Sequence, residues 1–133
     1  MTSKGICQIR VYYEDTDLSG VVYHANYLRY FERARTEWLR DAGFSQEALK
    51  RDQGVVFAVA NVSVDFIAPA RLDDFLEVTT ILKERRRASL SFVQTAAIVG
   101  EPARVLALAT VRVACVAATT FRPRALPPIG LAQ

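Results

Sequence analysis

Residues 25–42, with the sequence ANYLRYFERARTEWLRDA, carry the pattern that decides the fold. Apolar side chains recur in this stretch at spacings of three and four residues, which is the period of an amphipathic helix. These positions are Tyr27, Leu28, Phe31, Ala34, Trp38, Leu39 and Ala42. At about 1.5 Å per residue such a helix spans roughly 25 Å. Gly43 is placed to end it in the left-handed conformation.

The segments on both sides of this helix alternate apolar and polar residues, which is typical of half-buried strands. One strand, residues 6–13, precedes the helix. A short second helix follows, capped by Ser45 and with its body over residues 47–51. Four more strands are predicted over residues 55–67, 75–84, 89–99 and 104–116. The break at Gly100 suits a hairpin turn between the last two.

Strands that are close in sequence favour an antiparallel sheet. The apolar stripe of the long helix needs a sheet face to cover it. We therefore expect an α+β fold with a curved, five-stranded antiparallel sheet wrapped around one long central helix. The length of 133 residues suits a single domain over residues 1–133. Residues 121–133 contain three prolines, which predicts an extended, weakly ordered tail.

Two features of the predicted strands concern surfaces. In the strand over residues 55–67, we expect Ala58, Ala60 and Val62 to share one face with Val64 and Phe66, because strand side chains alternate. The long, apolar sheet edges invite uncontrolled pairing, so we expect that dimerisation hides them.

The composition excludes several classes of protein. Hydrophobic residues make up 51% of the chain and charged residues 23%, which is ordinary for a folded protein and unlike a disordered one. The net charge of +3 permits a polyanionic ligand without requiring nucleic acid. The chain has no apolar run of signal-peptide or membrane-spanning length. We therefore expect a cytoplasmic protein with no membrane span.

Cys7 and Cys115 lie in apolar alternating segments and lack a CxxC spacing, so we expect buried, reduced thiols. His24 is the single histidine of the chain, which makes a histidine-based zinc centre an unfavoured interpretation. We expect no metal and no cofactor.

Three acidic residues, Glu14, Asp15 and Asp17, precede Gly20 and the start of the long helix. The first turn of a helix offers unpaired N–H groups that can stabilise a carbonyl oxygen as it gains negative charge. A carboxylate on the preceding loop could reach the carbonyl carbon or a water beside it. This arrangement suits acyl transfer. By the residues alone, such an acidic loop is most often a solvated turn that caps the helix. His24 is equally a packed or capping histidine.

Residues 13–39, YEDTDLSGVVYHANYLRYFERARTEWL, resemble the signature of the 4-hydroxybenzoyl-CoA thioesterase family. The core motif reads DxDxxGxVxHxxY over residues 15–27, and it is long and specific. The resemblance is closest to the branch encoded with the Tol-Pal envelope system. It extends through residues 69–74, 86–89 and 122–127, and so covers nearly the whole chain.

The resemblance implies a hotdog fold and the hydrolysis of a short- or medium-chain or aromatic acyl thioester to a free acid and coenzyme A. The catalytic carboxylate of the family falls on Asp17, which acts as a nucleophile or as a general base on water. The backbone N–H that polarises the thioester carbonyl falls on Tyr23 or His24. The His24 side chain, which the parent benzoyl-CoA enzymes lack, would orient the thioester or a water and implies a different acyl group.

The resemblance also implies binding sites and partners. Arg86, Arg87 and Arg124 are the candidates for holding the coenzyme A phosphates. The plain alternative is that residues 83–87 form a solvated hairpin end. The acyl carrier is coenzyme A, as part of the substrate, or acyl-carrier protein. The family forms homodimers with active sites at the subunit interface, often paired into homotetramers. Two competing interpretations are a non-catalytic acyl-binding or interaction module and a hotdog dehydratase or hydratase.

Overall fold

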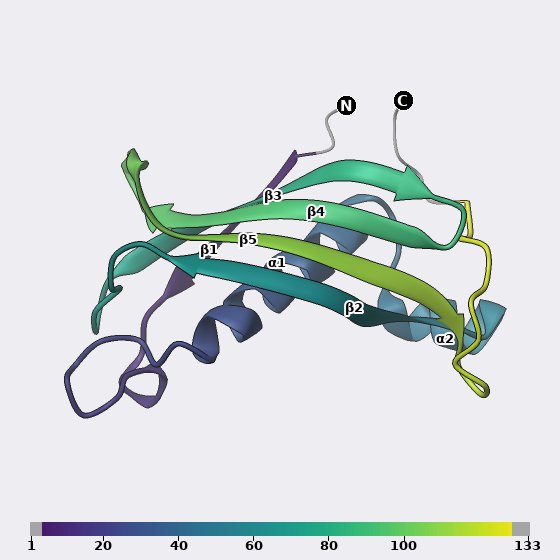
Figure 1. Ribbon diagram of the computed structural model, residues 1–133, viewed down its shortest axis with the longest axis horizontal. Coiled ribbons are helices and arrows are strands. Elements are labelled where there is room, and N and C mark those ends of the chain that lie inside the picture. The colour runs from purple at the N-terminus through teal and green to yellow at the C-terminus, as the bar shows by residue number, and fades with distance from the viewer. Residues whose placement is uncertain (1–3, 129–133) are drawn as a thin grey trace.

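The structure is a computed structural model that describes residues 4–128. Its strands are β1 (Lys4–Arg10), β2 (Val55–Phe66), β3 (Phe75–Arg86), β4 (Ser89–Ile98) and β5 (Glu101–Ala117), and its helices are the 3-10 turn η1 (Tyr13–Asp15), α1 (Asn26–Asp41) and α2 (Gln46–Gln53). The five strands form one antiparallel sheet in the order β1-β3-β4-β5-β2. Helix α1 lies against one face of this sheet (Figure 1). The predicted α+β class and five-stranded antiparallel sheet are confirmed.

Helix α1 buries most of the apolar stripe that the sequence predicted, but Leu28 of that stripe is 44% exposed, and Tyr30, which the pattern left out, is fully buried. Its 16 residues begin and end within one residue of the predicted bounds, and Gly43 follows with a positive φ of 96°. The Trp38 ring packs edge-on against Phe92 of β4, with 5.0 Å between ring centroids. A Cβ on Gly5 of β1 would lie 3.1 Å from the Trp38 ring, so this glycine lets β1 approach the helix closely.

A polar network lies in the core between α1 and the sheet. Gln94 of β4 is fully buried, and its side-chain amide donates to the Phe31 carbonyl and to the Thr80 hydroxyl, each over 2.9 Å. Its side-chain oxygen accepts from Arg35 Nη1 over 3.0 Å. All three hydrogen bonds join α1 or β3 to β4, so they fix the helix relative to the sheet.

Strand β2 departs from the simple alternation that the sequence predicted. Ala58 pairs with Ala114 and Val59 with Val113, but the next pair is Asn61 with Arg112, so Ala60 is an extra residue in a bulge. A bulge shifts the alternation by one residue. Val59 and Val62 therefore share the side that faces α1, opposite the buried Val113 and Val111. The prediction that Ala58 and Ala60 share the face of Val62 is wrong.

β2 is an edge strand, because it pairs with β5 alone. The side chains on its helix-facing side stay open to solvent in the single chain. Val59 is 52% exposed, Val62 41% and Phe66 53%. A long edge with exposed apolar side chains is a surface on which another strand can pair.

The tail is extended and bonded to the sheet where the structure describes it. Arg124 N donates to the Cys115 carbonyl over 2.9 Å, and Leu126 N donates to the Arg87 carbonyl over 2.8 Å. These hydrogen bonds join residues 124–126 to the end of the sheet, and the rest of the predicted tail, residues 129–133, lies outside the described part of the chain.

Neither helix α1 nor helix α2, the α-helices of residues 4–128, has the length and apolar composition needed to cross a membrane. Cys7 and Cys115 are free thiols, the first half-buried and the second buried. Burial raises the pKa of both thiols above the ordinary value.

Candidate active site

The loop between β1 and α1 folds into a tight turn that presents Asp17. Asp17 N donates to the Val21 carbonyl over 2.9 Å, and Gly20 N donates to the Asp17 carbonyl over 3.0 Å. Gly20 has a φ of 82°, which a residue without a Cβ adopts at little cost. The two backbone hydrogen bonds and the glycine together place the Asp17 side chain at the tip of the loop.

The Asp17 carboxylate is held through one of its two oxygens. Oδ1 accepts from the Ser19 hydroxyl over 2.6 Å and from Ser19 N over 2.9 Å. Both bonds favour the charged form, so Ser19 lowers the pKa of Asp17 below its ordinary value. Both Ser19 hydrogen bonds go to Oδ1, so Ser19 does not engage Oδ2. Asp17 is thus an ionised carboxylate that Ser19 holds through Oδ1 alone.

The start of α1 presents unpaired backbone donors. Val22 N donates to the Ala70 carbonyl over 2.8 Å, and Tyr23 N donates to the Asp15 carbonyl over 3.0 Å. The amides of His24 and Ala25 have no acceptor among the described residues. Of the two residues that the sequence left open as the carbonyl-polarising donor, His24 is therefore the one whose N–H is free.

Aromatic side chains flank these donors. The His24 ring centroid lies 4.5 Å from that of Tyr23 and 6.1 Å from that of Phe66, which ends β2. Tyr27 packs against Phe66 at 5.5 Å, and its hydroxyl accepts from Ala70 N over 3.0 Å. The end of β2 therefore forms an apolar wall beside the start of α1.

Two grooves adjoin this region, and Asp17 lines neither. One, of about 360 Å³, runs between α1 and β2 and is lined by Leu28, Arg29, Glu32, Arg35, Val59, Val62 and Val111. The other, of about 340 Å³, lies between β1 and α1 and includes Asp15. The Asp17 side chain itself is exposed. A single chain therefore places the reactive groups on its surface without enclosing them.

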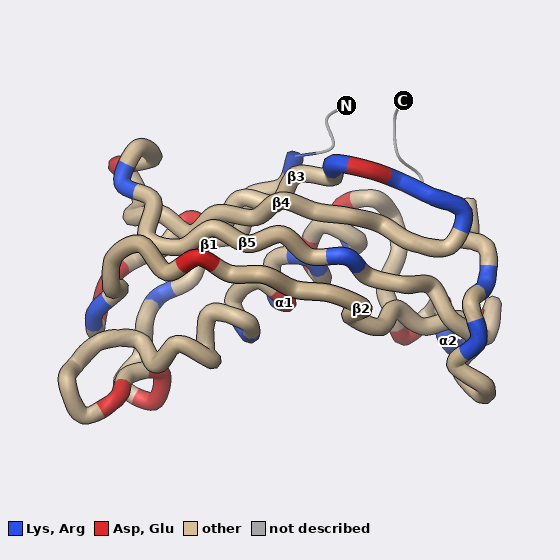
Figure 2. Tube along the Cα trace, in the orientation of Figure 1, with Lys and Arg blue, Asp and Glu red and all other residues tan. Residues whose placement is uncertain are grey.

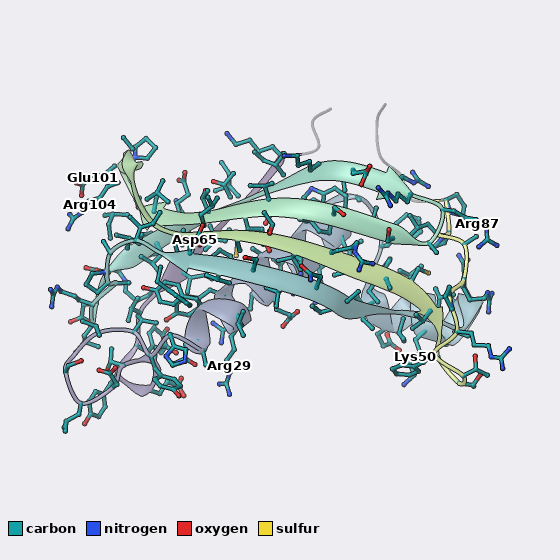
Figure 3. The ribbon with its side chains drawn as sticks, viewed as in Figure 1. Arg29, Lys50, Asp65, Arg87, Glu101 and Arg104 are labelled. Atoms are coloured by element: carbon teal, nitrogen blue, oxygen red, sulfur yellow. The ribbon has the colours of Figure 1, made fainter. Side chains whose placement is uncertain are left out.

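The predicted phosphate-binding arginines lie together, but far from Asp17. Arg86 and Arg87 follow one another at the β3–β4 turn, and the hydrogen bond from Leu126 N to the Arg87 carbonyl brings the Arg124 segment beside them. β3 has 12 residues, so its length of roughly 36 Å separates this turn from the loop end of the sheet. Figure 2 shows the resulting polarity, with the acidic loop at one end and a basic run at the other. Arg87 and Lys50 mark the basic end in Figure 3.

Two residues of the loop escaped the sequence analysis as site residues. Ser19 controls the Asp17 carboxylate, and the signal was its position two residues after an aspartate, where a short polar side chain closes a local turn. Asp15 holds the helix start through its carbonyl, which also accepts from Asn26 Nδ2 over 2.8 Å. No sequence pattern predicts that the backbone carbonyl of this residue accepts hydrogen bonds from the start of the helix.

Comparisons with known proteins place these features in context. Residues 11–133 match the family model of the thioesterase-like superfamily. A protein of Escherichia coli O6:H1 named acyl-CoA thioester hydrolase YbgC is 50% identical over 125 residues, which cover 94% of this chain and 91% of that protein.

Solved structures agree with this match. The crystal structure of a probable thioesterase from Bartonella henselae is 38% identical, with a TM-score of 0.87 over 93% of this chain and 99% of that one. A mutant 4-hydroxybenzoyl-CoA thioesterase, complexed with 4-hydroxybenzoyl-CoA, has a TM-score of 0.84 at 22% identity and covers 95% of this chain and 94% of its own, which shows likeness of fold alone.

Proposed function

The chain belongs to the thioesterase-like superfamily, and on that premise we propose that it hydrolyses acyl-coenzyme A to a free acid and coenzyme A, with Asp17 as its catalytic carboxylate. The predicted resemblance to thioesterases of the 4-hydroxybenzoyl-CoA type is confirmed, and so is thioester hydrolysis as the activity. The residues that perform it, the acyl group and the assembly are the proposal.

One observation carries the catalytic part. An ionised carboxylate whose Oδ2 is not engaged by Ser19 and an unpaired amide at the start of a helix, that of His24, belong to the same loop-to-helix segment. A thioester carbonyl that accepts from His24 N gains a donor which strengthens as the oxygen becomes negative. The helix dipole adds to this stabilisation at the first turn of α1. Tyr23 and the His24 ring border the same space and would orient the thioester.

Two routes fit this geometry. In one, Asp17 Oδ2 attacks the carbonyl carbon, coenzyme A leaves as a thiolate, and water hydrolyses the resulting anhydride. In the other, Oδ2 takes a proton from a water as that water attacks, and the thiolate leaves in the same way. Both consume one water and yield the acid and coenzyme A. Neither route requires a cofactor, because coenzyme A is part of the substrate.

The exposure of Asp17 in one chain is the reason to propose a homodimer as the working unit. The free β2 edge, with Val59, Val62 and Phe66 exposed, is the surface that would pair with a second copy. Pairing of two β2 edges would be antiparallel by symmetry. The two sheets together would then wrap their helices in the hotdog arrangement, and the partner would cover the apolar wall at Phe66.

An antiparallel pairing also brings opposite ends together. β2 runs from Val55 beside the basic end to Phe66 beside the Asp17 loop. The Asp17 loop of one copy would therefore lie at the same end of the dimer as the basic turn of the other. Arg86, Arg87 and Arg124 of that copy would meet the phosphates of a coenzyme A whose thioester lies at Asp17. The proposed compartment is the cytoplasm, where buried thiols such as Cys115 stay reduced.

The direct test measures release of coenzyme A with a thiol-reactive dye. Wild-type protein should release it from at least one member of a panel of short, medium-chain and aromatic acyl-CoA, with an acyl-carrier-protein thioester as a further arm. Asp17→Asn should lose at least about a hundredfold in kcat. Asp41→Asn, an exposed aspartate at the far end of α1, is the matched control and should keep full activity. Full activity in Asp17→Asn would remove the proposed mechanism.

A complementation experiment tests the shared site. Asp17→Asn chains and chains with all three arginines changed to alanine should each be weak with acyl-CoA. Mixed after co-unfolding and refolding, half of the dimers would contain one copy of each, with one intact site among two. The mixture should then regain about a quarter of wild-type activity. A triple-arginine variant that is fully active by itself would exclude the arginines. Mixed activity that stays at the average of two inactive parents would place both groups of residues in one chain's site.

A further inference from the structure

The hydroxyl of Tyr27 is a buried polar group that takes no part in the proposed chemical steps. Tyr27 is 3% exposed, and its hydroxyl accepts from Ala70 N over 3.0 Å. Ala70 has no exposed surface, so its N–H needs an acceptor inside the fold, and the phenol is that acceptor. Burial raises the pKa of Tyr27, which keeps the phenol neutral. A phenylalanine would fill the same space but could not accept this hydrogen bond.

Ala70 is bonded to the chain on both sides of His24. Its N–H donates to Tyr27, in the first turn of α1, and its carbonyl accepts from Val22 N over 2.8 Å. The N–H of His24, between these two residues, has no acceptor in the part of the chain that the structure describes. The backbone between Val22 and Tyr27 is therefore held at both ends by one buried residue. The amide that would polarise the thioester lies in the middle of this stretch.

The peptide group that carries this N–H is also fixed. Its carbonyl, that of Tyr23, accepts from Asn26 N over 2.8 Å. The peptide is trans, so its N–H points opposite to its carbonyl and away from Asn26. Tyr23 N donates to the Asp15 carbonyl over 3.0 Å, which secures the other side of Tyr23. The N–H of His24 therefore has a set direction, as stabilisation of a developing negative charge requires.

The segment that contains Ala70 also contacts the loop of Asp17. Arg71, the next residue, forms an isolated β-bridge with Val21. The Val21 carbonyl accepts from Asp17 N over 2.9 Å. This short segment thus contacts both the loop that carries the carboxylate and the helix start that carries the amide. The separation of the two groups depends on how firmly the segment is held to α1, and the Tyr27 hydroxyl holds it there.

We propose that Tyr27 is a positioning residue of the thioesterase, whose hydroxyl keeps the N–H of His24 at a fixed distance and direction from Asp17. This role rests on the proposed function. Tyr27 does not touch the reacting atoms, since its hydroxyl is bonded inside the fold. A misplaced donor loses its effect mainly in the transition state, where the carbonyl oxygen is most negative. The loss therefore falls on kcat rather than on KM.

Tyr27→Phe is the first test, assayed by release of coenzyme A and by thermal unfolding. We expect kcat to fall about tenfold with KM changed by less than about twofold. The melting temperature should fall as well, because Ala70 N loses its acceptor. Thr80→Val is the matched control, because Thr80 is 1% exposed and its hydroxyl accepts from Gln94 Nε2 over 2.9 Å. This control should lower the melting temperature and keep the wild-type kcat. Wild-type kcat in Tyr27→Phe, or an equal loss of kcat in Thr80→Val, would overturn the proposal.

Amide hydrogen exchange tests the positioning without a substrate. In the wild type, the N–H groups of Ala70 and Val22 should exchange slowly, because each is bonded inside the fold. In Tyr27→Phe, both should exchange faster by a larger factor than the amides of β4. An equal acceleration over the whole sheet would mean that the hydroxyl serves stability alone, which contradicts the proposal. An unprotected Ala70 N–H in the wild type would contradict it even where Tyr27→Phe does not fold.

The two proposals fail in different ways. A wild-type chain that releases no coenzyme A from any acyl-CoA of the panel would overturn the proposed function, and the role of Tyr27 with it. An active wild type together with a fully active Tyr27→Phe would overturn the positioning role alone and leave the proposed function in place.

Discussion

Ser19 donates two hydrogen bonds to a single carboxylate oxygen of Asp17. Its hydroxyl oxygen lies 2.6 Å and its backbone nitrogen 2.9 Å from Oδ1. The arrangement favours the ionised form of a solvent-exposed carboxylate and leaves Oδ2 unengaged by Ser19. It also fixes the side chain, because two bonds from one residue leave little freedom of rotation. The proposed catalytic use of Asp17 therefore depends on a residue that does no chemistry itself.

Ser19→Ala should shift the pH dependence of the reaction. The side-chain hydrogen bond is the largest cause of the lowered pKa of Asp17, so its loss raises that pKa toward the ordinary value. If Asp17 reacts in its ionised form, as proposed, activity would then be lost at a higher pH on the acid side. The acid limb of the kcat/KM profile should move to higher pH, with Ser91→Ala, on the outer face of β4, as the unmoved control. An acid limb that stays in place would mean that another group titrates.

Gly20→Ala should damage catalysis more than stability. Gly20 has a φ of 82° and Gly100 a φ of 84°, and neither has an atom within 4 Å of an added Cβ. Both substitutions should therefore cost about 1–2 kcal/mol of backbone strain, measured by urea unfolding. The β4–β5 turn at Gly100 does not hold the carboxylate, so Gly100→Ala should keep its kcat, and Gly20→Ala should lose about tenfold. Equal kcat in both would show that the turn at Gly20 does not position Asp17.

Gln94→Leu should destabilise the fold. Gln94 is buried and makes three side-chain hydrogen bonds. Its replacement by leucine removes the hydrogen-bond partner of the Thr80 hydroxyl, the Phe31 carbonyl and the Arg35 guanidinium. We expect a loss of about 2–4 kcal/mol in the free energy of unfolding. Gln8→Leu makes the same change at an exposed position of β1 and should cost less than about 0.5 kcal/mol. Comparable losses at the two positions would contradict the stabilising role of the network.

Val62→Lys should separate assembly from folding. Val62 is 41% exposed in the single chain, so a lysine fits there without disturbing the core. Two lysines facing each other across paired β2 edges would oppose association. The variant should elute as a folded monomer with less than about a hundredth of wild-type kcat/KM. Ile81→Lys, at 42% exposure on β3, is the matched control and should remain an active dimer. A Val62→Lys dimer would exclude the β2 edge as the interface.

The sequence predicted the fold well where one local pattern decides the structure. The helical period over residues 25–42, the Ser45 cap and the turn at Gly100 all occur as expected. The predictions were wrong or incomplete where a distant segment decides. The bulge at Ala60 is set by the register with β5, and residues 124–126 are joined to the sheet by bonds to Cys115 and Arg87. The alternation of apolar and polar residues along the sequence contains no information on the register with β5 or on these long-range hydrogen bonds.

The sequence by itself determined the family and the proposed catalytic residue, because the motif over residues 15–27 is contiguous and specific. Only the tertiary structure decided which amide is free, since Tyr23 N is taken by Asp15 and His24 N is not. It also decided that the arginines at the β3–β4 turn lie at the other end of the sheet from Asp17. The physical reason is that hydrogen-bond partners and distances across a sheet depend on strand order and register, which arise from contacts between residues far apart in the chain.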